Sequence, residues 1–186
     1  MDVVKKVKAL NRAVSVLKGG GIVISCTDTV YGFLTLAGNK KSVDRIYKIK
    51  KRAKSKPLPL FVSSIKKAKE FAEIDIKEEK ILKKYWPGKY TFVLKRKKGL
   101  KLYDGAKDTI ALRIPKHSFL NMLSKKINKP LVQTSVNISD QAPLLKISDI
   151  IEQFGKLDIL LIDSGNIKKG KPSRIVDLTI NKILRK

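Results

Sequence analysis

The sequence predicts an α/β protein in which a twisted sheet of parallel and antiparallel strands is flanked by helices. Segments with the apolar period of amphipathic helices alternate along the 186 residues with short apolar runs of strand length. Late in the chain some strand-like segments follow one another without a helix between them, which favours a mixed sheet. No repeat, low-complexity stretch or linker interrupts this pattern, so we expect one domain over residues 1–186.

The N-terminal part is expected to contain two helices around a buried strand. Apolar residues at alternating steps of four and three predict an amphipathic helix over residues 3–18, which three glycines end. The apolar run at 22–26 (IVISC) predicts a buried strand. Ser42 is the expected N-cap of a second helix, which ends near Lys51 and before Pro57.

The rest of the chain continues the alternation. The expected strands are residues 58–62, 90–95, 109–114, 131–134, 159–162, 174–178 and 182–184. The expected helices are residues 64–72, 76–86, 118–127 and 147–154. The lysine-rich stretch 95–101 (KRKKGLK) is expected to be a solvated turn between strands.

The charge is strongly basic. The chain has 42 lysines and arginines against 16 acidic residues, which gives a net charge of +26. Such a charge favours a polyanionic partner, and RNA is the obvious candidate. A general excess of lysine in the composition would produce the same charge, so both interpretations stay open.

Several classes of protein are excluded. Cys26 is the only cysteine and His117 the only histidine, so the chain has no disulfide framework and no Cys/His metal site. No apolar run approaches the ~20 residues of a membrane span, and the N-terminus lacks the apolar core of a signal peptide. We expect a cytoplasmic protein that is not associated with a membrane.

A polar turn follows the first predicted strand. Residues 27–32 (TDTVYG) stand at a strand end, where α/β sheets bind ligands. Two threonine hydroxyls and a tyrosine phenol could fix a small polar molecule, and Gly32 permits close approach of the backbone. An ordinary polar turn would use the same residue types.

Two cations follow the second predicted helix. Lys50 and Arg52 do not share a helix face, so they can reach one ligand only if the helix has ended there. Together they suggest a phosphate or carboxylate ligand, because arginine can bind either group through two hydrogen bonds. Cations are also favoured at helix C-termini without any ligand.

Two later strands carry polar residues that a core does not need. Arg113 lies within the apolar strand 109–115 (TIALRIP), where an arginine is costly unless it is paired or binds an anion. Ser135 and Asn137 lie two residues apart after another strand and can point the same way. A turn or helix cap would also favour this pair of residue types.

The sequence has neither a Walker-type phosphate loop nor a GxGxxG fingerprint. If ATP is bound, side chains must hold its triphosphate. We expect no protein-ligated metal, and any metal would be Mg²⁺ that accompanies the nucleotide.

In chain order, the polar segments resemble the motifs of the YrdC-like family of threonylcarbamoyl-adenylate synthases. The turn 27–32 is similar to the family's P-T-[DE]-T-V-Y-G-L motif. The other matching segments are 49–58 (IKKRAKSKPL), 86–91 (WPGKYT), 109–115 (TIALRIP), 134–137 (TSVN), 172–177 (PSRIVD) and 183–185 (ILR). The match runs from Gly21 to Arg185, and its specificity comes from many motifs in the right order.

The resemblance implies a YrdC-like fold and a nucleotidyltransferase. L-Threonine, bicarbonate and ATP would give threonylcarbamoyl-AMP and pyrophosphate, and the product would modify adenosine in tRNA through partner threonylcarbamoyltransferase proteins. The implied catalytic residues are Lys50, Arg52, Ser135 and Asn137. The implied threonine-binding residues are Thr29, Arg113, Gln133 and Ser173. The implied ATP-binding residues are Arg52, Lys56, Thr109, Ser135, Pro143 and Arg185.

The sequence departs from the family pattern at a few positions. Cys26 and Lys89 replace prolines, and Phe61 stands where some members have a histidine beside threonine. Asp140 replaces a glycine, and Arg174 replaces a threonine. None of these changes removes a member of the expected catalytic set.

Two alternatives remain. One is an enzyme that forms a related carbamoyl-adenylate, although the family members of that type are much longer chains with zinc-finger-like cysteines. The other is an RNA-binding module of the same fold without adenylation activity. The charge supports it, whereas the low aromatic content of 6% does not.

Overall fold

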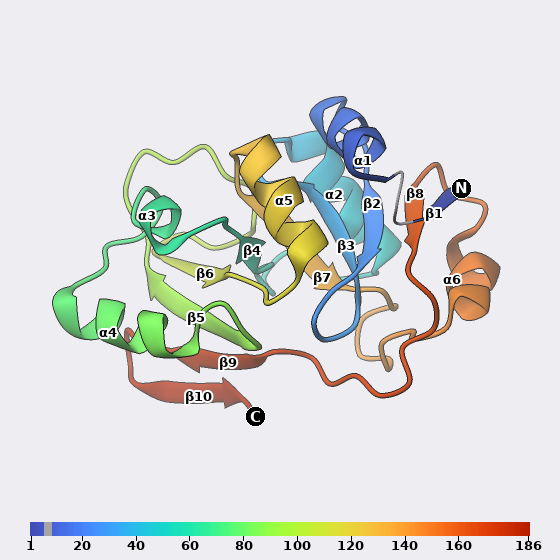
Figure 1. Ribbon diagram of the computed structural model, residues 1–186. Coiled ribbons are helices and arrows are strands. Elements are labelled where there is room, and N and C mark those ends of the chain that lie inside the picture. Colours follow the sequence, from blue (N-terminus) through green and yellow to red (C-terminus); the bar gives the residue numbers. More distant parts are fainter. Residues whose placement is uncertain (6–8) are drawn as a thin grey trace.

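The computed structural model describes residues 1–5 and 9–186 (Figure 1). Within these residues the strands are β1 (Asp2–Lys5), β2 (Val23–Cys26), β3 (Tyr31–Leu36), β4 (Leu60–Phe61), β5 (Tyr90–Lys95), β6 (Thr109–Arg113), β7 (Leu131–Ser135), β8 (Leu160–Asp163), β9 (Arg174–Asp177) and β10 (Lys182–Arg185). The helices are α1 (Ala9–Lys18), α2 (Lys40–Ile49), α3 (Ile65–Ala68), α4 (Ile76–Tyr85), α5 (Ser118–Ile127) and α6 (Ile147–Phe154).

The described strands form one mixed sheet in the order β1-β8-β2-β3-β7-β4-β6-β5-β9-β10. The pairs β1–β8, β2–β8, β4–β6 and β5–β9 are parallel. The pairs β2–β3, β3–β7, β4–β7, β5–β6 and β9–β10 are antiparallel. The predicted fold class, a mixed sheet flanked by helices, is confirmed.

Helices cover the two faces of the sheet. On one face α1 and α5 lie side by side over β2, β3 and β8 (Figure 1), and Leu17 of α1 and Leu123 of α5 belong to the same buried cluster as Val23. On the other face α2 and α6 contribute Ile46 and Phe154 to the larger core cluster. No helix in the described part of the chain is long and apolar enough to cross a membrane.

The first predicted helix began too early. Residues 2–5 form β1, which pairs in parallel with β8 in the register Asp2 to Leu160. Among the described residues of the predicted helix 3–18, Ala9–Lys18 are helical and residues 3–5 are not, whereas Val7 lies outside the described residues. Pairing with an available sheet edge satisfies the backbone of this short tail, which outweighs its local helical pattern.

Other boundaries also differ from the sequence pattern. Asn39, not Ser42, caps α2, since its side-chain oxygen accepts a hydrogen bond from the Ser42 backbone N–H at 3.1 Å. The strand β3 was not predicted, because its first two residues, Tyr31 and Gly32, also belong to the polar turn and the apolar run that remains is short. The expected strand at 58–62 reduces to the two residues of β4, and the expected helix at 64–72 to the four residues of α3.

The stretch 95–101 is not a fully solvated turn. The side chain of Arg96 is 7% exposed and forms a 2.7 Å ion pair with Asp104, whose side chain is 1% exposed. Burial raises the pKa of Asp104. The ion pair holds the loop between β5 and β6 against the core. The many lysines of the stretch suggested full exposure, although Arg96 among them is buried.

Candidate active site

A cavity of ≈ 640 Å³ opens on the sheet face that α1 and α5 cover only in part. Alternation along β6 makes this possible, because Ile110 and Leu112 point into the core while Thr109, Ala111 and Arg113 line the cavity. Such a volume is typical of a small-molecule site.

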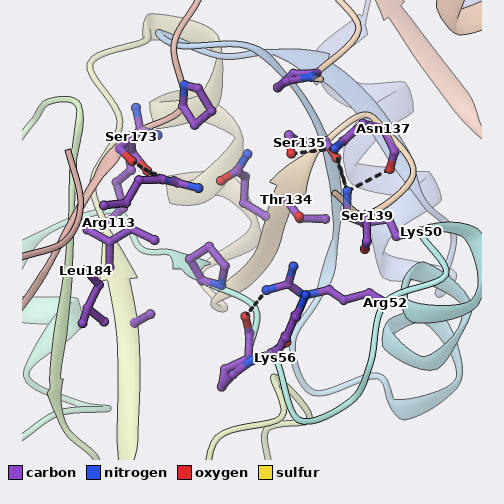
Figure 2. A pocket seen from close by; sticks show the side chains of 18 of the residues that line it. Lys50, Arg52, Lys56, Arg113, Thr134, Ser135, Asn137, Ser139, Ser173 and Leu184 are labelled. Carbon is purple, nitrogen blue, oxygen red and sulfur yellow. Dashed lines mark hydrogen bonds between the residues drawn. The ribbon is translucent and has the colours of Figure 1, made fainter. Parts of the chain in front are cut away.

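The cavity brings together every residue that the sequence predicted for the site. Its lining includes Thr29, Lys50, Arg52, Lys56, Thr109, Arg113, Gln133, Ser135, Asn137, Pro143, Ser173 and Arg185. Figure 2 shows Arg113 and Ser173 on one side of the cavity, and Lys50, Ser135 and Asn137 on the other. Segments that are far apart in the sequence therefore meet in one site.

Thr27 organises the polar turn that follows β2. Its hydroxyl accepts hydrogen bonds from the backbone N–H groups of Thr29 (3.0 Å) and Val30 (3.1 Å), and lies 2.8 Å from the Thr29 hydroxyl. The Thr27 oxygen also donates to the Val30 carbonyl at 2.7 Å. The turn is thus fixed internally, which leaves Thr29 at the cavity wall.

The phenol of Tyr31 does not serve the cavity, contrary to the sequence-based expectation. Tyr31 is fully buried, its hydroxyl donates to the Gly165 carbonyl at 2.7 Å, and it accepts from the Ser164 N–H at 3.2 Å. Burial raises its pKa to about 12. Tyr31 therefore ties β3 to the segment after β8.

Gly32 makes room for Gln133 on the neighbouring strand. The two residues face the same side of the sheet, and a Cβ atom on Gly32 would lie 2.7 Å from the Gln133 Nε2 atom. A side chain at position 32 would therefore displace the Gln133 amide from the cavity. The glycine of the turn is required by this close approach.

Arg113 is a buried cation of the site, with a side chain 1% exposed. Its Nη2 forms an ion pair with Asp28 Oδ1, and its Nε donates to the Gly88 carbonyl at 3.0 Å. The other Asp28 oxygen accepts from the Lys116 backbone N–H at 3.0 Å. The Phe61 ring lies 5.6 Å from the guanidinium. The expectation that this arginine must be paired is confirmed, and burial lowers its pKa.

The α2 helix ends directly before the two predicted cations. Its last residue is Ile49, Lys50 is the C-cap, and Lys51 adopts the left-handed conformation with φ of 48°. This change of direction lets Lys50 and Arg52 both line the cavity. The sequence required the helix to end here if Lys50 and Arg52 are to reach one ligand, and the structure meets this requirement.

The Lys50 ammonium lies among acceptors from the segment after β7. Its Nζ donates to the carbonyl of Ser135 at 2.7 Å, and to the carbonyl and the side-chain oxygen of Asn137 at 2.9 and 2.8 Å. The Ser135 hydroxyl donates to the same Asn137 side-chain oxygen at 2.7 Å. Burial, and then the nearby Arg52, lower the pKa of Lys50 to about 8.

Arg52 and Lys56 form the wall next to this cluster. The Arg52 Nε and Nη2 atoms donate to the carbonyls of Lys56 (2.9 Å) and Pro57 (3.0 Å). The Lys56 ammonium lies 3.4 Å from the Asp140 carboxylate across the cavity rim. Pro143 lines the cavity further along the loop that contains Asp140.

Ser173 and Arg185 form the opposite wall. The Ser173 hydroxyl lies 2.9 Å from that of Thr91, and Arg185 donates to the Ser173 carbonyl (2.8 Å) and hydroxyl (3.1 Å). Burial, and then the charges of Arg113 and Arg52, lower the pKa of Arg185. The cavity therefore concentrates positive charge from β6, from β10 and from the segment after α2, which suits an anionic ligand.

Two acidic residues, Asp140 and Asp177, line the cavity. Within the described residues, no group of three or more His, Cys, Asp or Glu side chains is placed to hold a metal ion.

Three residues of the site were missed by the sequence-based reasoning. Asp28 pairs with Arg113, Gln141 accepts a 2.7 Å hydrogen bond from Asn137, and Ser139 lines the cavity with a buried hydroxyl that has no hydrogen-bond partner among the described residues. A signal existed for Asp28, because it stands inside the polar turn and Arg113 needs an anion. Ser139 and Gln141 gave no separate signal.

The chain matches a protein family and several known proteins along most of its length. Residues 15–186 match the family model Sua5_yciO_yrdC, described as telomere recombination. A Methanocaldococcus jannaschii protein with the provisional name threonylcarbamoyl-AMP synthase is 36% identical over 165 residues, which are 89% of this chain and 78% of that protein. Human threonylcarbamoyl-AMP synthase is 31% identical over 180 residues, 93% of this chain and 64% of the human protein.

A solved structure gives the same picture. Pyrococcus abyssi Sua5 in complex with L-threonine superposes with a TM-score of 0.84 at 29% identity, over 96% of this chain and 53% of that one. The chain thus spans about half to two thirds of the longer proteins that it matches.

Proposed function

Since the chain belongs to the Sua5/YciO/YrdC family, we propose that it is an L-threonylcarbamoyladenylate synthase. In this reaction L-threonine, bicarbonate and ATP give threonylcarbamoyl-AMP and pyrophosphate. The observation that supports it best is the single cavity in which Arg113 and Thr29 stand at one end and Arg52, Lys56 and the Ser135–Asn137 segment at the other.

Arg113 and Thr29 would bind threonine. Arg113 uses Nε and Nη2 for Gly88 and Asp28, and its Nη1 donates to the Thr29 hydroxyl at 3.4 Å; the N–H groups that remain could hold the α-carboxylate beside Thr29. Thr29 would contact the substrate through its hydroxyl, and Gln133 and Ser173 would complete this end of the cavity. The relative from P. abyssi was solved with L-threonine, which agrees with a threonine subsite in this fold.

The phosphates of ATP would lie against Arg52 and Lys56. Both are cavity-lining cations that flank the cluster of Lys50, Ser135 and Asn137. Thr109, Pro143 and Arg185 would make further contacts with ATP, Arg185 from the opposite wall beside Ser173. No acidic cluster among the described residues could hold a metal, so Mg²⁺ would enter with the nucleotide.

The chemistry requires positioning and charge neutralisation more than a strong base. The threonine amine adds to bicarbonate and loses water to give a carbamate. A carbamate oxygen then attacks the α-phosphorus of ATP, and pyrophosphate leaves with the electron pair of the broken P–O bond. Fixed cations that neutralise the phosphates and hold both substrates in line would supply most of the rate enhancement.

The product would be passed on to modify adenosine in tRNA. We propose tRNA threonylcarbamoyltransferase proteins as partners, and the cytoplasm as the place of action, because ATP and tRNA are both present there. A net charge of +26 favours an additional contact with RNA. If the lysine surface binds tRNA, the binding constant should fall steeply as salt concentration rises.

One assay tests the proposed reaction: pyrophosphate release with each substrate omitted in turn. We expect release only when threonine and bicarbonate are both present, and Arg52→Ala should abolish it, whereas Arg174→Ala, at an exposed arginine of β9 outside the cavity, should not. Equal release without threonine would instead support an enzyme that makes carbamoyl-adenylate. No release by a correctly folded protein that binds RNA would support the RNA-binding alternative.

A further inference from the structure

Lys50 is the buried lysine of the site, with 1% of the residue exposed. An isolated ammonium is costly to bury, so its hydrogen bonds must account for its presence. It follows α2 directly, and its Nζ lies 6.0 Å from the centre of the Phe33 ring on β3. The side chain thus lies beneath the cavity wall.

The ammonium has as many partners as protons. A lysine ammonium has three N–H donors. Here they are matched by the Ser135 carbonyl, the Asn137 carbonyl and the Asn137 side-chain oxygen, at 2.7 to 2.9 Å. A hydrogen bond from Lys50 to a phosphate would require one of these contacts to break, and would leave a buried oxygen unpaired.

The backbone of Lys50 holds the same segment from a second point. Its carbonyl accepts a hydrogen bond from the Ser139 N–H at 2.8 Å. Asn137 extends the connection, because its Nδ2 donates to the Gln141 carbonyl at 2.7 Å. Lys50 therefore binds both ends of the segment 135–139, which contributes Ser135, Asn137 and Ser139 to the cavity wall.

Arg52 is in a different situation. Its Nε and Nη2 each donate to one carbonyl, of Lys56 and of Pro57. Among the described residues, its Nη1 donates to no protein acceptor. Arg52 thus keeps donors for an anion, whereas Lys50 does not.

We propose that Lys50 is a positioning residue, whose ammonium fixes the conformation of segment 135–141 and makes no hydrogen bond to ATP. The effect of Lys50 on adenylation rests on the proposed function. The claim that Lys50 fixes segment 135–141 does not. Arg52 and Lys56 then make the direct contacts with the phosphates. Lys50 acts on the reaction through Ser135 and Asn137.

Amide hydrogen exchange in the nucleotide-free protein tests the proposal directly. Lys50→Met keeps the length of the side chain and removes its donors. We expect exchange in segment 135–141 to accelerate at least tenfold, and Lys48→Met, an exposed lysine two residues earlier on α2, to leave it unchanged. If the exchange rates in Lys50→Met equal those of wild type, the proposal is wrong.

The pH profile of the same exchange distinguishes Lys50 from a merely structural contact. After correction for intrinsic exchange, protection of segment 135–141 in wild type should rise in a step as pH increases above about 8, because opening of the segment exposes Lys50, which then rebinds the proton that the closed, buried side chain has lost. Lys50→Met should show no such step. A step of equal size in both proteins would overturn the assignment.

A double-mutant cycle on the dissociation constant of ATP tests the absence of a direct contact. The effects of Lys50→Met and Asn137→Ala should combine to less than their product, because both act on one segment, while those of Lys50→Met and Arg52→Ala should multiply. Multiplying effects in the first pair, with unchanged exchange, would make Lys50 a direct ligand.

Two controls keep the outcome interpretable. If Lys50→Met does not fold, Lys50→Gln replaces it in the exchange experiment, since glutamine has a shorter side chain and two N–H donors where lysine has three. Faster exchange in segment 135–141 then supports the proposal, and wild-type rates refute it. Since exchange is measured without substrates, a failure of the pyrophosphate assay in wild type would refute the proposed function and leave this result standing.

Discussion

Arg113 and Asp28 form an ion pair that is almost completely buried, with 1% and 8% of their side chains exposed. The pair joins β6 to the turn after β2, and Asp28 also holds the backbone N–H of Lys116. Since Thr29 follows Asp28 in the same turn, one contact both stabilises the fold and sets the geometry of the proposed threonine subsite.

Removing the Asp28 charge should destabilise the protein. In Asp28→Asn the Arg113 guanidinium stays buried without an anion, and breaking such a pair costs about 3 kcal/mol. We expect the free energy of unfolding, measured with denaturant, to fall by about this amount. Asp2→Asn is the matched control, because the pair of Asp2 with Arg12 is 51% and 60% exposed and should contribute less than about 1 kcal/mol. Equal effects in both variants would show that Arg113 does not depend on Asp28.

Replacing Arg113 should weaken threonine binding far more than ATP binding. Arg113→Lys keeps the charge but loses the planar group that can hold Asp28 and a carboxylate together. We expect the KM for threonine in the pyrophosphate assay to rise about 100-fold, which corresponds to about 2.7 kcal/mol, with the KM for ATP nearly unchanged. Arg174→Lys is the control, since Arg174 is exposed on β9 and donates to the Tyr90 hydroxyl at 2.8 Å. A larger effect on the KM for ATP would place Arg113 in the nucleotide subsite.

Local patterns in the sequence were sufficient to predict much of the fold. The bounds of α5 and α6 match their expected ranges, because apolar periodicity determines helices over eight to ten residues. The sequence also indicated that Arg113 has a special role, since a cation in an apolar strand needs an anion.

Long-range contacts account for the rest. β1 forms because it can pair with the edge of β8, which lies far away in the chain: Asp2 pairs with Leu160, about 158 residues later. The sequence predicted that Arg113 has an acidic partner but not which one. Asp28 lies 85 residues away in the chain, and a separation in sequence does not reveal how close two residues are in the fold. Likewise, the sequence placed Lys50 in the site without showing that Ser135 and Asn137 occupy all its donors.

The stability of the protein should depend on pH through Lys50. Its pKa is lowered from 10.5 to about 8, so between these values the unfolded chain binds a proton that the folded protein does not. The free energy of unfolding should therefore rise with pH over this interval, relative to Lys50→Met, by about 3 kcal/mol. Denaturant unfolding of both proteins from pH 7 to pH 10.5 measures the difference. A difference that stays constant with pH would mean that burial does not lower the pKa of Lys50.

Asp140 should weaken ATP binding in the wild-type protein. Its carboxylate lies at the cavity rim, 3.4 Å from the Lys56 ammonium that would otherwise meet a phosphate. Its φ of 66° is in the left-handed region, which glycine adopts more easily, and glycine is the residue of the family motif that the sequence resembles here. Asp140→Gly removes the charge and relieves the backbone, but loses an exposed ion pair worth at most about 1 kcal/mol.

We therefore expect Asp140→Gly to change the free energy of unfolding by less than about 1 kcal/mol, and to bind ATP about three- to tenfold more tightly in a calorimetric titration with Mg²⁺. Asp140→Asn separates the two effects, because asparagine also tolerates the left-handed region but has no charge. It should match Asp140→Gly in affinity if the charge is the cause. Weaker binding in both variants would mean instead that the Asp140 carboxylate favours ATP binding, either by holding the Mg²⁺ that accompanies ATP or by orienting the Lys56 ammonium.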